Sequence, residues 1–409
     1  MGGSDVLNAI RLTRWREDQR VRLGISYAGD PGLWPVDDAF PGIQTVAAIV
    51  GYCRSLETEV DTWAREMLET RSMRVSVPLT ETVIPVDLSE LWACGVTYAQ
   101  SRDARETEPQ TGHDIYAQVY HAKRPEIFFK APGPRVVGPN ATVGLRRDAT
   151  WHVPEPELTV ILDDRGSFFG ITVGNDMTAR DLEAINPLYL PQAKMFHHSA
   201  SIGPSIVLAS TVDWTQLSIT LEVWRRGDRV MYDSTDTSRL RRSVAELVHA
   251  VQHEWPLAPW TGIMTGTGIV PPDEFALEEG DEIHITIPEV GTLVNVAQRI
   301  DSSWADVAPG TTRVLHIDPR DTVAVSLGEL TPGQTVTIGT QLVKVNQAIP
   351  FGHKVALTKM EIGDWVIKYG ERIGTASGPI VPGDHVHTHN LESYRGRGDR
   401  GNTDGGELS

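Results

Sequence analysis

Cysteine is scarce in this sequence. The chain of 409 residues contains two cysteines, Cys53 and Cys94. Two cysteines do not form the disulfide framework that stabilises many secreted proteins. We therefore expect a protein of a reducing compartment, the cytoplasm.

Positive charge is also in short supply. Lys and Arg total 37 against 54 Asp and Glu, which gives a formal net charge of -17. Nucleic acids and anionic membrane surfaces are bound through basic patches, so we expect no nucleic-acid partner and no membrane partner.

Long apolar runs are missing as well. The N-terminal stretch MGGSDVLNAIRLTRWRED has no apolar run long enough for a signal peptide, and no later segment approaches the length of a membrane span. Both absences agree with the expected location in the cytosol.

The chain is longer than one ordinary core requires, so we expect two or three domains. Residues 45–71 show the spacing of one helical run of about seven turns at most. From about residue 126 to 300, short strand patterns alternate with Gly and Pro. This pattern predicts an α+β fold that is predominantly β, with a rolled, mixed β-sheet rather than a doubly wound sheet.

Changes in composition divide the chain into five segments. We expect an N-terminal α+β segment (1–88), a main domain (89–300), a linker (301–311), a small all-β domain (312–393) and a polar, glycine-rich tail (394–409). The tail is expected to be disordered because it has too few apolar residues to pack.

Two carboxylates open a predicted strand in the main domain. The stretch EPELTVIL begins with Glu155 and Glu157, and side chains two apart on a strand point to the same side. Asp176 ends the next predicted strand, FFGITVGND, and a hairpin through DDRG would bring it close to the pair. Three carboxylates suit a hard cation such as Mg²⁺. The alternative is a solvated strand start, because surface Glu is common.

These residues stand in motifs of a known family. The metal-binding core of the fumarylacetoacetate hydrolase superfamily resembles EPELTVILDDRGSFFGITVGNDMTARDLE, and a second part of it resembles MTGTGIVPPDEFALEEGDEIHITIPEVGTLVNVA. The likeness covers about residues 90–297, with the preceding segment as the smaller N-terminal part of one catalytic unit. It implies a rolled mixed β-sheet of that family's type and a homo-oligomer, a dimer or higher. It also implies Glu155, Glu157 and Asp176 as ligands of Mg²⁺, with Mn²⁺ or Ca²⁺ as substitutes.

A narrower likeness is to the branch that dehydrates 2-keto-3-deoxy-pentonates, such as 2-keto-3-deoxyarabinonate, to 2,5-dioxopentanoate. The stretches that resemble it are RPEIFFK, INPLYLPQAK and GVTYAQSRDARE. The likeness implies that Lys194 and Glu126 are the catalytic residues that contact substrate and move protons. The plain alternatives are a surface lysine after a turn and a carboxylate at a strand edge.

Four more residues are expected to bind substrate: Ser101, Arg102, His198 and Thr265. Ser101 and Arg102 lie in the stretch where hydrolytic members carry a His that helps to activate water, so its absence argues against C–C bond hydrolysis. The neighbouring His197 and His198 would face opposite ways on a strand, so at most one of them lines the pocket. Thr265 belongs to TGTG, which equally fits a glycine-rich hairpin turn.

The chemistry of the expected substrate fixes the outline of a mechanism. A 2-keto acid chelates Mg²⁺ through its carboxylate and keto oxygens, and the metal acidifies the C3 protons by stabilising the enolate. A base removes a C3 proton, and the C4 hydroxyl leaves with help from an acid. Glu126 and Lys194 are expected to share proton transfer and polarisation of the keto group, in either assignment. A Schiff base at Lys194 is the less favoured route, because the metal already supplies the electron sink.

A stretch of about 80 residues before the tail resembles a different family. The small SAF, or β-clip, domain of altronate and galactarate dehydratases is similar to GHKVALTKMEIGDWVIKYGERIGTASGPIVPGDHVHTHNLES, over about residues 312–393. His385, His387 and His389 alternate and would share one face of a strand, which fits a second, transition-metal site. The alternative is a row of hydrogen-bonding histidines, and His353 with Lys354 could contact an anionic substrate.

The function expected from all of this is dehydration of a 2-keto-3-deoxy sugar acid by an Mg²⁺-dependent lyase. Two alternatives stay open. The first is an acylpyruvate hydrolase or a 2-oxo-acid decarboxylase of the same superfamily, because decarboxylation needs the same metal and enolate. The second is a sugar-acid binding protein without catalytic activity.

Overall fold

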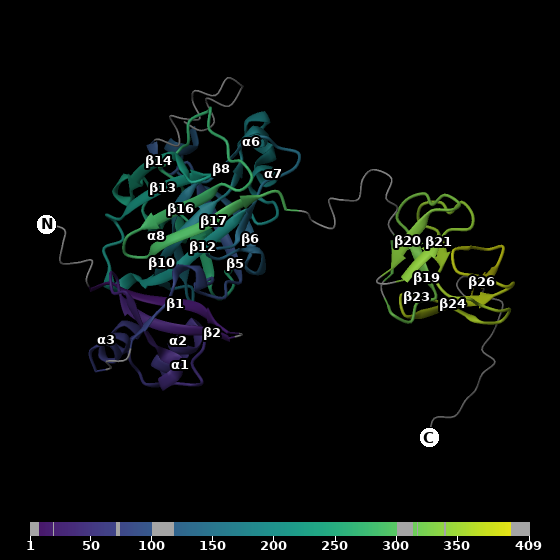
Figure 1. Cartoon of the computed structure of the whole chain (residues 1–409), viewed down its shortest axis with the longest axis horizontal. Helices are drawn as coiled ribbons and strands as arrows, with labels where there is room; N and C mark the ends of the chain where they lie inside the picture. Colours follow the sequence, from purple (N-terminus) through teal and green to yellow (C-terminus); the bar gives the residue numbers. More distant parts are fainter. Residues whose placement is uncertain are drawn as a thin grey trace. The chain divides into compact units, whose positions relative to one another are not determined.

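The structure is a computed structural model, and it describes residues 8–18, 20–70, 74–99, 118–300, 314–316, 318–338 and 341–393. The chain forms two compact units, residues 1–300 and 301–409 (Figure 1). Strands predominate in both units, which confirms the predominantly β fold.

Unit 1 contains seventeen of the labelled strands. They are β1 (Ile10–Glu17), β2 (Arg20–Tyr27), β3 (Gly32–Pro35), β4 (Val75–Ser76), β5 (Glu90–Gly95), β6 (Glu126–Pro132), β7 (Thr142–Gly144), β8 (His152–Val153), β9 (Pro156–Leu162), β10 (Phe168–Asp176), β11 (Thr178–Ala179), β12 (Ala200–Leu208), β13 (Ser218–Arg225), β14 (Asp228–Asp236), β15 (Thr261–Met264), β16 (Glu282–Ile287) and β17 (Gly291–Gln298). Its described α-helices are α1 (Val36–Ala39), α2 (Val46–Ser55), α3 (Val60–Thr70), α6 (Arg180–Ile185), α7 (Leu190–Lys194) and α8 (Val244–Gln252).

Two mixed sheets form the body of unit 1. The larger sheet has the order β4-β3-β2-β1-β12-β10-β9-β15-β5-β6, and the smaller has the order β14-β13-β16-β17-β7. Most neighbouring strands are antiparallel, but β15 pairs with β5, and β17 with β7, in parallel. The described strands therefore form the mixed sheet that the sequence predicts.

The two sheets are held together by a shared apolar core. Leu158 of β9 and Ile171 of β10 belong to one buried cluster with Leu221 of β13 and Ile285 of β16. All four side chains are fully buried. Burying a side chain of this size stabilises the fold by roughly 1.5–3 kcal/mol, so this layer fixes the central hairpin of β9 and β10 firmly.

The helical run predicted over residues 45–71 is two helices, so the prediction of one helix is wrong. Helix α2 begins after Thr45, whose hydroxyl accepts a hydrogen bond from the Ala48 N–H, and ends before Leu56. Glu57 has a φ of 52°, a left-handed conformation that an α-helix cannot contain. The break lets Ile49 of α2 and Trp63 of α3 join one buried cluster.

Unit 2 contains the remaining strands. They are β18 (Val314–Leu315), β19 (Val323–Ser326), β20 (Thr335–Ile338), β21 (Gln341–Lys344), β22 (Lys354–Ala356), β23 (Trp365–Lys368), β24 (Glu371–Ala376), β25 (His385–Val386) and β26 (Leu391–Ser393). Their sheets have the orders β18-β19-β22-β25, β20-β21 and β23-β24-β26. Two small apolar clusters, one around Val366 and one around Leu357, belong to this unit alone.

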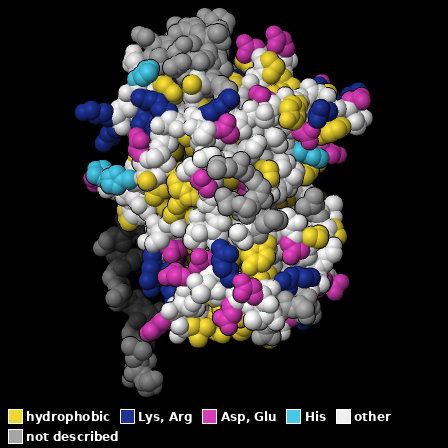
Figure 2. Space-filling model, turned by 90° about the vertical axis from the view of Figure 1, so that its left-hand side faces the viewer, with side chains coloured by type: hydrophobic (Ala, Val, Ile, Leu, Met, Phe, Trp, Pro, Cys, Tyr) yellow, Lys and Arg dark blue, Asp and Glu magenta, His cyan; other side chains and the backbone are white. Residues whose placement is uncertain are grey.

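The surface carries both signs of charge. Figure 2 shows acidic and basic side chains interspersed over the face that it draws. Within the described ranges, no helix combines the length and the apolar character needed to cross a lipid bilayer.

Candidate active site

The hairpin of β9 and β10 brings three carboxylates together. The strands pair antiparallel with Gly174 opposite Glu157. The Asp176 N–H donates to the Glu155 carbonyl at 3.0 Å, which sets Asp176 opposite Glu155. Side chains directly opposite one another on paired strands point to the same face. The hairpin that the sequence predicts through DDRG is therefore present, and it produces the predicted cluster.

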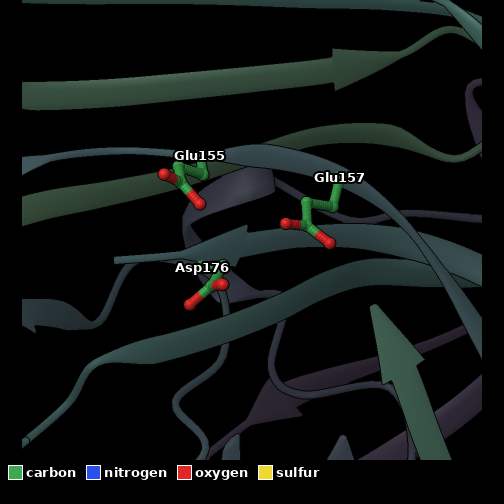
Figure 3. Close-up of side chains that lie close together, drawn as sticks. All are labelled: Glu155, Glu157 and Asp176. Atoms are coloured by element: carbon green, nitrogen blue, oxygen red, sulfur yellow. The ribbon is translucent and has the colours of Figure 1, made fainter. Parts of the chain in front are cut away.

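The three carboxylates are buried and close. Glu155, Glu157 and Asp176 are at most 2% exposed. Each offers one oxygen, and these oxygens lie within 4.8 Å of one another. Figure 3 shows the three carboxyl groups turned toward a common space. The alternative of a solvated strand start is excluded, because solvated carboxylates would be exposed.

The pKa of Glu157 is shifted by this arrangement. Burial raises the pKa of Glu157 well above its usual range, and the nearby carboxylates of Asp176 and Glu155 raise it further. The Gly266 N–H donates to Glu157 Oε2 at 2.6 Å and acts in the opposite direction. Three buried carboxylates that offer only oxygen ligands fit a hard divalent cation.

Three cationic side chains surround the carboxylates. Lys194, at the end of α7, places its Nζ 2.5 Å from Glu155 Oε2 and 2.9 Å from Asp176 Oδ2. Arg180 Nη2 lies 3.4 Å from Glu155 Oε1. Lys130 forms an ion pair with Asp176 Oδ1. Lys194 is thus buried at the cluster, and the alternative of an ordinary surface lysine is excluded.

Lys130 was not singled out by the sequence reasoning. Its Nζ also donates to the carbonyl oxygens of Met177 and Lys194, at 3.0 and 2.5 Å. The signal that could have found it is strand alternation, because Glu126, Phe128 and Lys130 of RPEIFFK are two apart along β6. Burial lowers the pKa of Lys130, and the Asp176 carboxylate opposes that shift.

A small cavity adjoins the carboxylates. Its wall includes Glu126, Glu157, Glu183, Lys194 and Thr267. The free space measures about 10 Å³, roughly room for one water molecule. The two residues expected to be catalytic, Glu126 and Lys194, therefore line the same cavity as the predicted metal ligands. Glu183 and Thr267 are further lining residues that the sequence reasoning missed.

Glu126 is positioned by its neighbour on β5. It pairs with Gly95, which has no side chain. A Cβ atom added to Gly95 would meet Glu126 Oε2 at 2.1 Å. The glycine therefore provides the space in which the Glu126 carboxyl group lies.

Thr265 is hydrogen-bonded to the backbone of β9. Its hydroxyl and its N–H both donate to the Leu158 carbonyl, at 2.9 and 3.0 Å, and the side chain is fully buried. These bonds join the TGTG turn to β9. The next two residues, Gly266 and Thr267, reach the cavity instead.

His197 and His198 do not lie on a strand, so the argument from alternation does not apply to them. They form part of a turn, and their rings stack with centroids 4.2 Å apart. His198 Nδ1 lies 3.0 Å from the Thr142 carbonyl, away from the residues that line the cavity. The other two expected substrate ligands, Ser101 and Arg102, fall outside the described residues.

The histidines of unit 2 are close, but not as a strand row. Strand β25 ends at Val386, so the premise that His385, His387 and His389 share a strand face is wrong. The described contacts centre on His385, whose Nε2 lies 2.8 Å from His353 Nδ1 and whose ring centroid lies 5.4 Å from that of His387 and 5.3 Å from that of His389. Among the described residues, the group of ligand atoms within 4.8 Å is the carboxylate triad, not this cluster.

Comparison with protein families agrees with the geometry. The family model for the fumarylacetoacetate (FAA) hydrolase C-terminal domain matches residues 91–298, half of the chain. The chain belongs to the FAA hydrolase family. The model for the altronate/galactarate dehydratase SAF domain matches residues 312–394. Both resemblances found in the sequence are thus confirmed.

Two relatives of this chain bear dehydratase names. A probable 2-keto-3-deoxyxylonate dehydratase of Haloferax volcanii is 40% identical over 268 residues, 65% of this chain and 92% of the relative. The 2-dehydro-3-deoxy-D-arabinonate dehydratase of Saccharolobus solfataricus is 39% identical over 219 residues, 53% of this chain and 74% of the relative.

A solved structure and a third relative extend the comparison. A 2-keto-3-deoxy-D-arabinonate dehydratase complexed with magnesium and 2,5-dioxopentanoate aligns with a TM-score of 0.59 and 30% identity, over 71% of this chain and all of that chain. The altronate dehydratase of Escherichia coli is 42% identical over 88 residues, which is 20% of this chain and 18% of that relative.

Proposed function

We propose that this chain is an Mg²⁺-dependent hydro-lyase that dehydrates 2-keto-3-deoxy sugar acids, for example a 2-keto-3-deoxy-pentonate to 2,5-dioxopentanoate. The observation that carries the proposal is the convergence of Glu155, Glu157 and Asp176 with Lys194 and Glu126 on one buried cavity. Support comes from the two relatives named as dehydratases of this substrate class and from the aligned dehydratase complex with magnesium.

In this proposal, Glu155, Glu157 and Asp176 hold the metal. Their oxygens suit Mg²⁺, and Mn²⁺ or Ca²⁺ would use the same ligands. When bound, Mg²⁺ would supply Lewis acidity that stabilises the negative charge on the keto oxygen as the C3 proton leaves. Lys130 and Arg180 orient Asp176 and Glu155 through the ion pairs described above.

Glu126 and Lys194 are proposed to move the protons. One of them removes a proton from C3, and the other protonates the hydroxyl that leaves C4. Both line the cavity, and Lys194 also contacts two of the metal ligands. Lys194 is therefore placed next to a substrate held at the metal.

The size of the cavity implies that side chains rearrange when substrate binds. A five-carbon acid needs far more room than about 10 Å³. Lys194 is the side chain whose ammonium occupies the space between Glu155 and Asp176, so its movement would open that space.

The proposal is tested by a proton NMR time course. Purified protein with Mg²⁺ is incubated with D- and L-2-keto-3-deoxypentonates, 2-keto-3-deoxyhexonates, oxaloacetate and acetylpyruvate. We expect an aldehyde signal from a keto-deoxy acid, lost on EDTA treatment and in Glu157→Gln. The matched control is Glu254→Gln, because the Glu254 side chain is 89% exposed.

Other products would contradict the proposal. Acetate or pyruvate would identify a hydrolase or a decarboxylase. Tight binding of a keto-deoxy acid without any turnover would identify a binding protein. A second measurement separates the two proton carriers. The exchange of the C3 protons of the substrate with solvent is followed in D₂O for Glu126→Gln and for Lys194→Met. The variant that no longer exchanges these protons lacks the base.

Several finer expectations remain part of this proposal. They are the segment limits at 88, 300, 311 and 393, location in the cytosol, a homo-oligomer, and a second transition-metal site at His385, His387 and His389. Light scattering of the purified chain tests the oligomer. Metal analysis of wild type against His387→Ala tests the second site, which a metal content unchanged by the substitution would exclude.

A further inference from the structure

Helix α7, which carries Lys194, is too short to be stable on its own. It spans the five residues Leu190–Lys194. Isolated helices of this length are unstable in water, and the last carbonyl groups of a helix have no partner within it. The segment just before α7 gives it little cover, since Leu188 is 83% exposed. Contacts at the C-terminal end of α7 therefore help to fix the position of Lys194.

Two cationic side chains bind the carbonyl groups at this end. Arg146 Nη1 donates to the Gln192 carbonyl at 3.1 Å, and Lys130 Nζ donates to the Lys194 carbonyl. Phe196 follows the helix, and the centroid of its ring lies 6.0 Å from Arg146 Cζ and 5.8 Å from Lys130 Nζ. Cations at such distances from an aromatic ring are attracted to its face. The chain that leaves α7 is thus tied to the same two side chains as the helix.

The guanidinium group of Arg146 is itself held in place. Its Nε and Nη2 donate to the two oxygens of Asp148 at 2.8 and 2.5 Å, a bidentate pair that fixes the plane of the group. The main chain is fixed as well, because the Arg146 N–H donates to His152 Nε2 at 2.9 Å and the Arg146 carbonyl accepts from Arg299 Nη1 at 2.7 Å. Arg146 Nη1 therefore binds α7 from a rigid support.

Arg146 does not reach the reacting centre. It is not one of the residues that line the cavity beside the carboxylates. Among the described residues, its acidic partner is Asp148 rather than a proposed metal ligand. Its effect on the reaction must then pass through the backbone of α7.

We propose that Arg146 is a positioning residue for Lys194. It fixes the end of α7 through the Gln192 carbonyl, so that the Lys194 ammonium lies between Glu155 and Asp176. Because the bond is made to the main chain, the Lys194 side chain stays free to move when substrate binds. This inference rests on the proposed function, in which Lys194 moves a proton at a substrate held by the metal.

Two substitutions of Arg146 test this role. Arg146→Gln removes the cation and the bidentate pair with Asp148. Arg146→Lys keeps a cation that can donate to the Gln192 carbonyl, but an ammonium group cannot form the bidentate pair. Both variants are made in the full-length chain, and urea unfolding shows whether each is folded.

Arg54→Gln is the matched control. Arg54 forms ion pairs with Asp163 and Asp164 at 2.9 and 2.8 Å, and its side chain is 29% exposed, against 19% for Arg146. It lies on α2 and has no described contact with α7. The control therefore loses comparable ion pairs without disturbing Lys194.

We expect Arg146→Gln to lower kcat about tenfold or more and to change KM less than about threefold, because a displaced proton carrier slows the chemical step rather than binding. Arg146→Lys should have a kcat between those of Arg146→Gln and the wild type. Arg54→Gln should leave kcat unchanged.

A second measurement requires no turnover. The Lys194 ammonium contacts carboxylate oxygens that Mg²⁺ would bind, so loosening it should favour the metal. In calorimetry, Arg146→Gln should tighten Mg²⁺ binding at least about threefold. It should have no further effect in Lys194→Met, which has no ammonium to position. This double-mutant cycle measures the coupling of the two residues even if the NMR assay finds no dehydration.

Three results would overturn the inference. The kcat of Arg146→Gln stays within about twofold of the wild type. Arg54→Gln loses as much kcat as Arg146→Gln, which would indicate a general loss of stability. Or Arg146→Gln changes Mg²⁺ affinity equally with and without Lys194, which would mean that Arg146 acts through its charge and not through Lys194.

Discussion

Lys194 is expected to affect both metal binding and catalysis. Its ammonium contacts Glu155 and Asp176, two of the proposed metal ligands, so it competes with a divalent cation for their oxygens. We predict that Lys194→Met tightens Mg²⁺ binding about tenfold or more, because it removes that competition and a like charge. The same variant should lose dehydration. Calorimetry with Mg²⁺ and the NMR assay measure the two effects.

Lys130 serves as the control for this prediction. It is also buried beside Asp176 but binds two backbone carbonyls, so it holds structure as well as charge. We expect Lys130→Met and Lys194→Met both to lower thermal stability without Mg²⁺, because each leaves a buried carboxylate unpaired, and we expect Mg²⁺ to restore stability in Lys194→Met. Weaker Mg²⁺ binding in Lys194→Met would contradict the idea that the lysine competes with the metal.

His152 makes stability depend on pH. Burial lowers the pKa of His152 from the usual 6.5 to about 4, and its Nε2 accepts a hydrogen bond from the Arg146 N–H. Between about pH 4 and pH 6.5, His152 is protonated in the unfolded chain but neutral in the folded chain. The stability contributed by neutral His152 is therefore complete above about pH 6.5 and is lost as the pH falls toward 4.

The size of this effect can be measured. Lowering the pH from 7 to 5 should cost about 2 kcal/mol through His152 alone. His152→Gln keeps a hydrogen-bond acceptor and does not titrate. Between pH 7 and 5, its free energy of unfolding in urea should therefore fall by about 2 kcal/mol less than that of the wild type. Equal pH dependence of the two proteins would show that other groups govern acid sensitivity.

At the scale of single residues, motif and spacing predicted some positions and not others. Glu155, Glu157 and Asp176 follow from one hairpin, so the sequence contains all the information that brings them together. Thr265 and Thr267 are alike in the sequence, and only the hydrogen bonds of the folded turn separate them. Arg180 reaches Glu155 from the start of α6, a packing that local pattern does not reveal.

The pairing of β5 and β6 controls the position of Glu126. An alanine at Gly95 would place its Cβ 2.1 Å from Glu126 Oε2, and the carboxyl group, as the free end of a flexible side chain, must move away. We predict that Gly95→Ala lowers kcat about tenfold or more, with a change in unfolding free energy within about 1 kcal/mol. Steady-state kinetics and urea unfolding test the two parts.

A second glycine is the matched control. Gly51 lies within α2 and has open space where its Cβ would be. Gly51→Ala should therefore stabilise the protein by about 0.5–1 kcal/mol and leave kcat unchanged. Full activity in Gly95→Ala would indicate that Glu126 does not need its present position.

Helices and strands were predicted correctly where the sequence pattern runs through the whole element. They were predicted wrongly where the conformation of one residue ends the element. The strand patterns EPELTVIL and FFGITVGND form β9 and β10, as predicted. The run over residues 45–71 keeps its helical pattern across the break, so only the backbone at Glu57 reveals two helices. The alternation HVHTHN resembles a strand, but the chain turns after Val386, where His387 and Asn390 bond within a turn.

At the scale of the whole molecule, the two units have separate apolar cores. We predict two unfolding transitions in calorimetry. Mg²⁺ at about 100 times its Kd should raise the unit 1 transition by a few degrees, because binding adds about 2.7 kcal/mol to the folded state. The unit 2 transition should not move.

The variants described above separate the two effects. Glu157→Gln should abolish the Mg²⁺-dependent rise without changing the unit 2 transition. A single cooperative transition, or a rise of both by Mg²⁺, would mean that the units unfold together, contrary to their separate cores.

The cationic partners of the triad have a consequence for how the protein is made. Lys130, Lys194 and Arg180 together carry as much formal positive charge as Glu155, Glu157 and Asp176 carry negative charge. The chain can therefore fold around the acidic cluster without a bound ion, because its own side chains neutralise the cluster. A metal at the proposed site would then bind after folding, so the yield of folded protein should not depend on the metal supplied during expression.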